Sequence, residues 1–162
     1  METSNFEKHQ KNQSINTKED IKMNSQVHSK ETIEQLLFDW DDALKNNDME
    51  RLLNLYAPDA IIESPIIAHL LQRESGICQG RDDFKKVLEL VEARKPLVRK
   101  HYKNKYFTDG TTLIWEYPRA TPEGDQIDFV EVMELNNGKI QCHRVYWGWY
   151  GMNVLKKDQY HR

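Results

Sequence analysis

The clearest candidates for chemistry are an acid and a histidine on the two arms of the last predicted β-hairpin. Glu131 lies in the alternating segment 126–135, and His143 lies in the next one, 139–150. A carboxyl group in an apolar pocket loses hydration, which favours its protonated form and lets it donate a hydrogen bond or a proton. An imidazole held beside it in one tautomer can act as a general base. The pair is therefore suited to proton transfer. The alternative is a structural role, in which Glu131 is a carboxylate whose charge is neutralised by His143 or Arg144.

The turn between these segments decides whether the two side chains meet. A three-residue loop at 136–138 with a glycine bulge pairs Leu135 with Lys139. Glu131 then lies opposite His143, and the two side chains share one face of the sheet. The other residues predicted on that face are apolar: Met133, Val145 and Trp147.

A two-residue turn at Asn137-Gly138 is the alternative. It moves the pairing by one residue and sets Glu131 opposite Arg144. The result would be an ordinary salt bridge rather than an acid–imidazole pair. Turn chemistry alone leaves both registers open.

Three further residues could reach such a pocket. Asp41 flanks the apolar stripe of the first predicted helix and could reach the cavity floor, although an acid there is also a common surface residue. Trp40 lies on the stripe itself, as a core residue or as a flat wall for a ring-shaped ligand. His69 lies in the irregular segment 66–80 and could reach the pocket mouth.

Hydrophobic spacing predicts three helices followed by four strands, which indicates an α+β domain with helices packed on one face of a strongly curved, mainly antiparallel sheet. The first helix begins with a sequence resembling a capping box at Thr32 and Gln35, and the second runs from Asp48 to Pro58. A short strand at 60–63 precedes the irregular segment. The remaining elements are a helix at 82–95 and strands at 98–107, 112–119, 126–135 and 139–150.

Composition narrows the classes of function. The 162 residues carry a formal charge of −3, so a nucleic-acid partner is not expected. No apolar run reaches the ~18 residues of a membrane span. The two cysteines form no disulfide framework, which indicates a reducing compartment and hence the cytoplasm. The six histidines show no paired metal-ligand spacing, so we expect no metal.

The polar composition of residues 1–28 predicts a disordered tail, because few apolar side chains are available to offset the ordering entropy. Residues 29–151 then form the domain, and residues 152–162 a C-terminal tail.

Three stretches in this order resemble the SnoaL-like branch of the nuclear transport factor 2-like superfamily: Trp40-Asp41-Asp42-Ala43-Leu44-Lys45-Asn46-Asn47-Asp48, Leu55-Tyr56-Ala57-Pro58-Asp59-Ala60, and Asn137-Gly138-Lys139-Ile140 before Arg144-Val145-Tyr146. The resemblance covers roughly residues 31–150. It implies a cone-shaped α+β barrel, a deep apolar pocket, no cofactor, and a homodimer formed through the outer sheet face. It also favours the three-residue loop.

Alignment with the ketosteroid isomerases of this superfamily suggests roles for single residues. Glu131 falls at the carboxylic acid of their oxyanion hole, whereas their hydroxyl donor and proton-abstracting carboxylate fall at Trp40 and Ser64, where the residue types do not match. The pocket-lining positions fall at His143, Val145 and Trp147.

We therefore expect a domain that binds a small, mainly apolar ligand, cyclic or polyketide- or steroid-like, and catalyses its isomerisation, cyclisation or dehydration. A non-catalytic ligand-binding or dimeric assembly module of the same fold is the alternative. The expected catalytic residues are Glu131, His143 and Asp41, and the expected ligand-binding residues are Trp40, Met133, Val145, Trp147 and His69.

Overall fold

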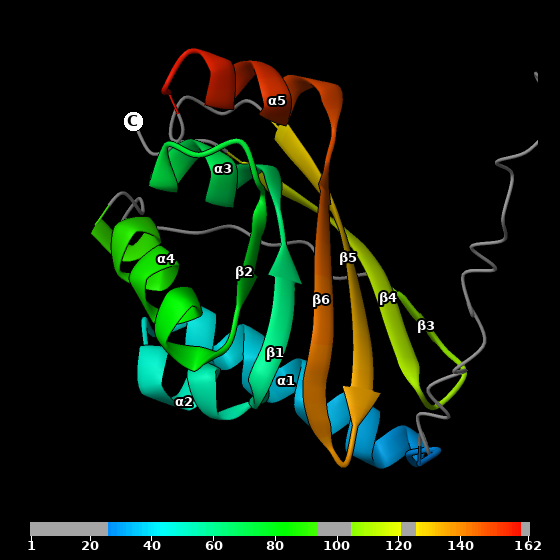
Figure 1. The fold of residues 1–162 in the computed structure, drawn as a ribbon. Coiled ribbons are helices and arrows are strands. Elements are labelled where there is room, and N and C mark those ends of the chain that lie inside the picture. Colours follow the sequence, from blue (N-terminus) through cyan, green and yellow to red (C-terminus); the bar gives the residue numbers. More distant parts are fainter. Residues whose placement is uncertain (1–25, 94–104, 121–125, 160–162) are drawn as a thin grey trace, which may run out of the picture.

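Six strands form one mixed, curved sheet in the order β2-β1-β6-β5-β4-β3 (Figure 1). The computed structural model describes residues 26–93, 105–120 and 126–159. All neighbouring strands are antiparallel except β1 and β6, which run parallel. The strands are β1 (Tyr56–Glu63), β2 (Ile77–Gln79), β3 (Tyr106–Thr108), β4 (Thr112–Ala120), β5 (Gln126–Asn136) and β6 (Lys139–Trp147).

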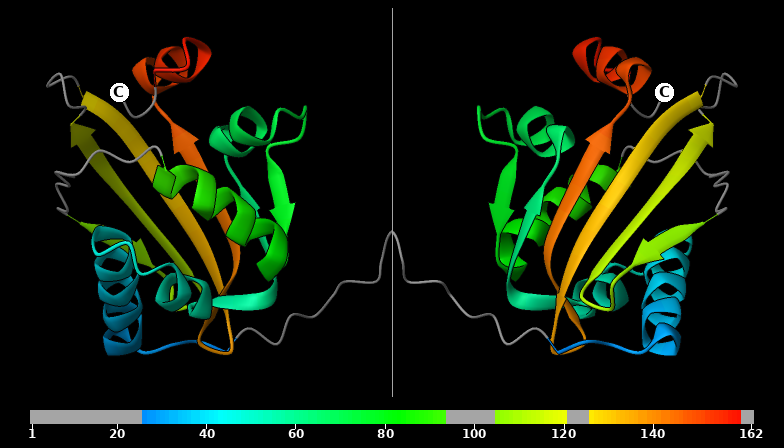
Figure 2. Two further views of the ribbon diagram at one scale, coloured as in Figure 1. Left: turned by 90° about the vertical axis from the view of Figure 1, so that its left-hand side faces the viewer. Right: turned by 90° about the vertical axis from the view of Figure 1, so that its right-hand side faces the viewer.

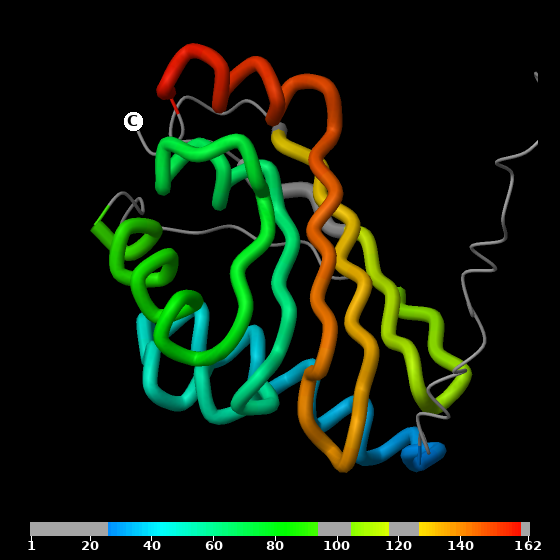
Figure 3. Tube along the Cα trace, in the orientation of Figure 1, coloured from blue at the N-terminus to red at the C-terminus, as the bar shows by residue number. Residues whose placement is uncertain are grey.

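The curved sheet wraps around helices on its concave face, as the two side views show (Figure 2). The helices α1 and α2 come first in this layer. Helix α4 lies between the side of the sheet formed by β1 and β2 and the side formed by β4 and β5 (Figure 2). The trace in Figure 3 shows α3 and α5 together at one end of the strands. The helices are α1 (Lys30–Lys45), α2 (Met49–Asn54), α3 (Pro65–Leu71), α4 (Arg81–Ala93) and α5 (Trp149–Lys156). This is the predicted α+β cone.

Alternation along β5 separates the two faces of the sheet. Phe129, Glu131 and Met133 are buried on the concave face, whereas Val130 and Val132 are only half-buried on the other. A strand covered by helices on one side has this period of two. The concave face of β5 is therefore the floor on which the helices pack, and Glu131 is the only ionisable residue that this stretch of the strand buries there.

The strand β1 starts earlier than predicted. The second helix ends at Asn54 instead of reaching Pro58, and the strand begins at Tyr56 instead of Ala60. A proline is tolerated here because the pairing of β1 with β6 is interrupted between Tyr56 and Ile61. No ladder hydrogen bond is lost where the proline lacks its N–H.

The segment predicted to be irregular contains both α3 and β2. Pro65 occupies the first turn of α3, where its missing N–H costs nothing, and Ser64 precedes it in extended conformation. Of the strand predicted at 98–107, the structure describes only the part from residue 105 onward, where β3 begins at Tyr106. Residues 98–104 and the predicted tail up to residue 25 lie outside the described residues.

The C-terminal boundary predicted at residue 151 falls inside a helix. The last strand ends at Trp147 rather than Tyr150, and α5 follows with Gly148 as its N-cap. Val154 and Leu155 are buried, so α5 packs onto the core with these two side chains, where a tail was predicted. None of the helices in the described part of the chain is long and apolar enough to cross a membrane.

Candidate functional site

The last hairpin closes with the two-residue turn, so the predicted three-residue loop is wrong. Asn137 and Gly138 both have positive φ angles, of 50° and 73°, and Asn136 pairs with Lys139. Positive φ at both central residues is the signature of the tight type I′ hairpin turn, for which Asn-Gly is the preferred sequence.

A β-bulge in β6 offsets the effect of this shorter turn, so that the later side chains of β6 still lie on the predicted face of the sheet. Leu135 pairs with Ile140, but Glu134 pairs with Cys142, so Gln141 is an extra residue in β6. An extra residue moves every later pair by one position. Glu131 consequently lies opposite Val145, and neither of the two predicted partners, His143 and Arg144, is directly across from it.

Glu131 and His143 nevertheless share the concave face and meet diagonally. Nε2 of His143 lies 2.5 Å from Oε2 of Glu131, and both side chains are no more than 4% exposed. Arg144 points to the opposite face, where its guanidinium bonds the Glu134 carboxylate. The acid–imidazole pair predicted from the sequence therefore exists, although its register differs.

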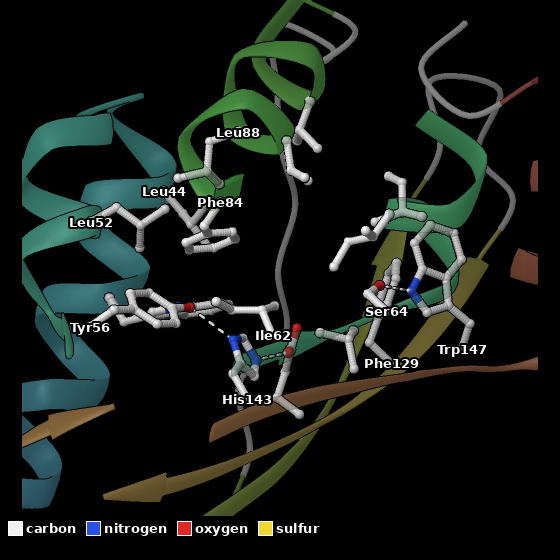
Figure 4. A pocket seen from close by; sticks show the side chains of 17 residues that line it. Leu44, Leu52, Tyr56, Ile62, Ser64, Phe84, Leu88, Phe129, His143 and Trp147 are labelled. Carbon is white, nitrogen blue, oxygen red and sulfur yellow. Dashed lines mark hydrogen bonds and ion pairs between the residues drawn. The ribbon is translucent and has the colours of Figure 1, made fainter. Parts of the chain in front are cut away.

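Tyr56 extends the pair into a buried chain of hydrogen bonds. The indole Nε1–H of Trp40 donates to the Tyr56 hydroxyl at 3.0 Å, and that hydroxyl lies 2.8 Å from Nδ1 of His143 (Figure 4). An indole can only donate, so the hydroxyl oxygen accepts from Trp40. Nδ1 is the only other partner that the described residues offer to this hydroxyl, so the hydroxyl hydrogen is assigned to that bond. The network thus assigns the proton of neutral His143 to Nε2, which donates it to Glu131.

Burial keeps Tyr56 in its neutral form. Loss of hydration raises the pKa of the phenol, the hydrogen bond from Trp40 partly offsets this rise, and the negative charge of Glu131 adds a smaller increase. A phenol that stays protonated remains a hydrogen-bond donor. Tyr56 therefore holds His143 in one tautomer.

A cavity opens in front of this chain, between the sheet and helices α1 to α4 (Figure 4). The volume of the cavity is about 110 Å³, which is smaller than the roughly 300–1,000 Å³ of typical small-molecule pockets. Its polar groups are those of Ser64, Glu131 and His143, with the tips of Trp40, Tyr56 and Trp147. The apolar walls are Leu44, Leu52, Ile62, Ile66, Ile67, Phe84, Val87, Leu88, Val91, Phe129 and Val145.

Five of the residues predicted for the site line this cavity: Trp40, Glu131, His143, Val145 and Trp147. Met133 shares their face but is fully buried in the core and does not line the cavity. Asp41 is half-buried on α1 and is not part of the lining, because the cavity face of that helix carries Trp40 and Leu44. His69 points to the C-terminal segment, where its Nε2 lies 2.8 Å from Oδ1 of Asp158.

The sequence prediction includes Tyr56 in the second helix, from Asp48 to Pro58, and does not connect it with His143. The two residues are 87 positions apart, and only the parallel pairing of β1 with β6 brings them together. Ser64 was noted as a mismatched position, yet its hydroxyl accepts a hydrogen bond from the Trp147 indole at 3.3 Å. Patterns within one segment carry no signal for either contact.

The described residues favour neither metal binding nor a thiol nucleophile. No group of three or more His, Cys, Asp or Glu side chains within 26–93, 105–120 and 126–159 is arranged to hold a metal ion. Burial raises the pKa of the Cys78 thiol to about 12, which removes it as a nucleophile at neutral pH. The cavity of Glu131 and His143 is therefore the candidate site.

The fold and its enclosed pocket define a nuclear transport factor 2-like α+β cone. The model of the SnoaL-like domain family matches residues 38–143, more than half of the chain, and the protein belongs to that family. A comparison with curated proteins finds no match.

Solved structures share the fold at low sequence identity. An NTF2-like protein of unknown function from Burkholderia pseudomallei K96243 has a TM-score of 0.64 at 16% identity, over 76% of this chain and 96% of that one. TerC, crystallised with polyporic acid, has a TM-score of 0.63 at 17% identity, over 78% and 98%. A candidate polyketide cyclase from Sinorhizobium meliloti has a TM-score of 0.56 at 16% identity, over 71% and 98%.

Proposed function

We propose that the protein binds a small, mainly apolar cyclic ligand in its cavity and that Glu131, with His143, moves a proton on it without a cofactor. The observation that carries this proposal is the buried 2.5 Å contact between the two side chains at the wall of a mainly apolar cavity. An acid–imidazole pair is costly to bury, so such pairs are enriched at functional sites. The names of the structural relatives, which include a polyketide cyclase, agree with ligands of this kind.

The tautomer of His143 with its proton on Nε2 leaves Glu131 as the group that accepts a proton from the ligand. Glu131, as a carboxylate, takes a proton from a carbon next to a carbonyl group of the ligand. The C–H bond breaks, an O–H bond forms on Glu131, and the electron pair moves to the carbonyl oxygen as an enolate. Return of the proton to a different carbon completes an isomerisation, and its use to expel water from the ligand completes a dehydration. His143 holds the carboxyl group in place through Nε2–H.

Occupation of the cavity can be tested with 2-naphthol, a fluorescent bicyclic phenol with the shape of such an enol. We expect saturable binding and a raised melting temperature, because a ligand that prefers the native state stabilises it. Val145→Phe fills the cavity and should abolish this binding. Val132→Phe, on the opposite face of the neighbouring strand, is the matched control and should bind normally. Equal affinity of both variants would place the ligand elsewhere.

We also propose that two copies associate through the outer sheet face. Ile61, Ile114 and Tyr146 expose 37% to 54% of their surface there, and Val130 and Val132 lie between them only half-buried. A second copy would remove this apolar surface from water. Sedimentation velocity should show a dimer of the 19.3 kDa chain, and Ile114→Glu should convert it to a monomer. A wild-type monomer at the highest soluble concentration would contradict this.

For the cellular location we propose the cytoplasm. The proposal rests on the two cysteines, Cys78 and Cys142, which form no disulfide.

A further inference from the structure

A second hollow lies on the other side of the wall that closes the cavity near Trp147. The residues that line this hollow and not the cavity are Glu63, Pro65, Ala68, Glu74, Gly76, Arg144 and Tyr146. Ser64, Val145 and Trp147 line both hollows. These three residues are therefore the partition between the cavity and the outer groove.

The partition is made of side chains because the sheet is incomplete at this place. The pairing of β1 with β6 ends at Glu63 and Arg144, whereas β6 continues to Trp147. The chain leaves β1 at Ser64 and turns into α3, so no strand lies beside the last three residues of β6 on this side. A side-chain wall can open by rotation about χ angles, which a hydrogen-bonded strand cannot do.

The Ser64 hydroxyl has two possible uses at this position. It accepts the Trp147 indole N–H at 3.3 Å (Figure 4), and Ser64 is also the N-cap residue of α3, where its side chain makes no capping hydrogen bond. Serine at an N-cap commonly accepts from a backbone N–H of the first turn. If the indole rotates away, the hydroxyl can take up that role, so the loss of one hydrogen bond is offset by the gain of another.

Close contacts with Gly76 fix the backbone at Ser64, whereas the side chains of Trp147 and Ser64 can exchange hydrogen-bond partners. The N–H of Ser64 donates to the carbonyl of Gly76 at 2.8 Å, and a Cβ added to Gly76 would lie 2.9 Å from the Ser64 carbonyl oxygen. The indole of Trp147 packs edge-on against Phe129 with ring centroids 4.8 Å apart, but it is only half-buried. The same ring lies against Gly151 of α5, where an added Cβ would be 2.9 Å from Cε3 of Trp147. Opening therefore needs Trp147 to rotate away from Phe129, Gly151 and Ser64.

We propose that Trp147 and Ser64 form a gate through which the apolar ligand passes between the outer groove and the cavity. The proposal rests on ligand binding in the cavity as proposed above. It adds the route of entry, and it makes Trp147 a determinant of how wide a ligand can be admitted. Tyr146, which belongs to the groove, also lies on the outer sheet face, so all variants are compared at one protein concentration to keep self-association constant.

The first test needs no ligand. Relaxation-dispersion NMR on the indole N–H groups should show microsecond-to-millisecond exchange for Trp147 and none for Trp40, whose indole is fully buried against Tyr56. Absence of exchange at Trp147 would overturn the gate even if 2-naphthol binds.

The second test measures passage through the groove. Ala68 lines the groove and not the cavity, so Ala68→Phe narrows the groove from its outer side. Stopped-flow fluorescence should then show association and dissociation of 2-naphthol slowed about threefold or more, with Kd within about a factor of two. Leu90→Phe, at an exposed site on α4, is the control and should keep both rates. Unchanged rates for Ala68→Phe would refute the route, whereas loss of binding by the wild type would refute the proposed function instead.

Discussion

Glu131→Gln should abolish proton transfer to an apolar ketone while leaving the cavity intact. A suitable substrate is 2-tetralone, whose protons next to the carbonyl exchange with D₂O and can be followed by NMR. We expect the exchange catalysed by the wild type to fall by about 10²- to 10⁴-fold, the contribution typical of a positioned acid–base group. The amide has the shape of the carboxyl and can still accept the hydrogen bond from Nε2 of His143, so 2-naphthol should bind with similar affinity.

Glu134→Gln is the matched control for this experiment. Glu134 lies three residues further along the same strand, on the opposite face, where it pairs with Arg144. Its replacement should leave the exchange rate unchanged. Equal rates for wild type, Glu131→Gln and Glu134→Gln would show that the cavity carries no proton-transfer chemistry and would leave a non-catalytic binding module.

Tyr56→Phe should destabilise the fold more than any other removal of a single hydroxyl group in the described part of the chain. The hydroxyl satisfies the indole N–H of Trp40 and Nδ1 of His143, and both are buried. Leaving buried polar groups without partners costs about 1–3 kcal/mol. Denaturant unfolding should show a loss of this size in the free energy of unfolding. Tyr106→Phe removes an exposed hydroxyl bonded to Glu34 and should change stability by less than about 0.5 kcal/mol.

Alkaline pH gives a second readout for Tyr56. Burial raises the pKa of this phenol in the folded state, whereas its pKa in the unfolded chain is about 10. The unfolded state therefore loses a proton first, and the stability associated with Tyr56 is present below that pH and is lost as the pH rises above it. Tyr56→Phe should lose less stability between neutral pH and strongly alkaline pH than the wild type does. Parallel curves would show that Tyr56 ionises normally in the folded protein.

Local patterns were sufficient for the elements that bury one regular face. The apolar spacing of α1 and α4 and the alternation of β4, β5 and β6 each describe an element that packs on one side. The segment 65–79 has no such pattern, because α3 has only seven residues and β2 only three. Pro58 suggested a helix end, and only the interrupted pairing of β1 explains its place in a strand.

The shared face of Glu131 and His143 was predicted for a partly wrong reason. The turn has two residues rather than three, and the bulge at Gln141 supplies the extra residue instead. Both arrangements place the two side chains on the same face, since a pleated strand repeats every two residues. The contacts of Tyr56 and Ser64 depend on tertiary packing between distant segments. The same holds for the hydrogen bond between His69 and Asp158.

The most direct test of the proposed site is NMR of the histidine side chains during a titration with 2-naphthol. In the free protein, the ¹⁵N shifts of His143 should show a proton on Nε2 and none on Nδ1, the arrangement assigned from its contacts with Tyr56 and Glu131. Added 2-naphthol should shift the His143 resonances in a saturable way and leave those of His69 unchanged. A proton on Nδ1, or His143 resonances that do not respond at saturation, would contradict a binding site built around Glu131 and His143.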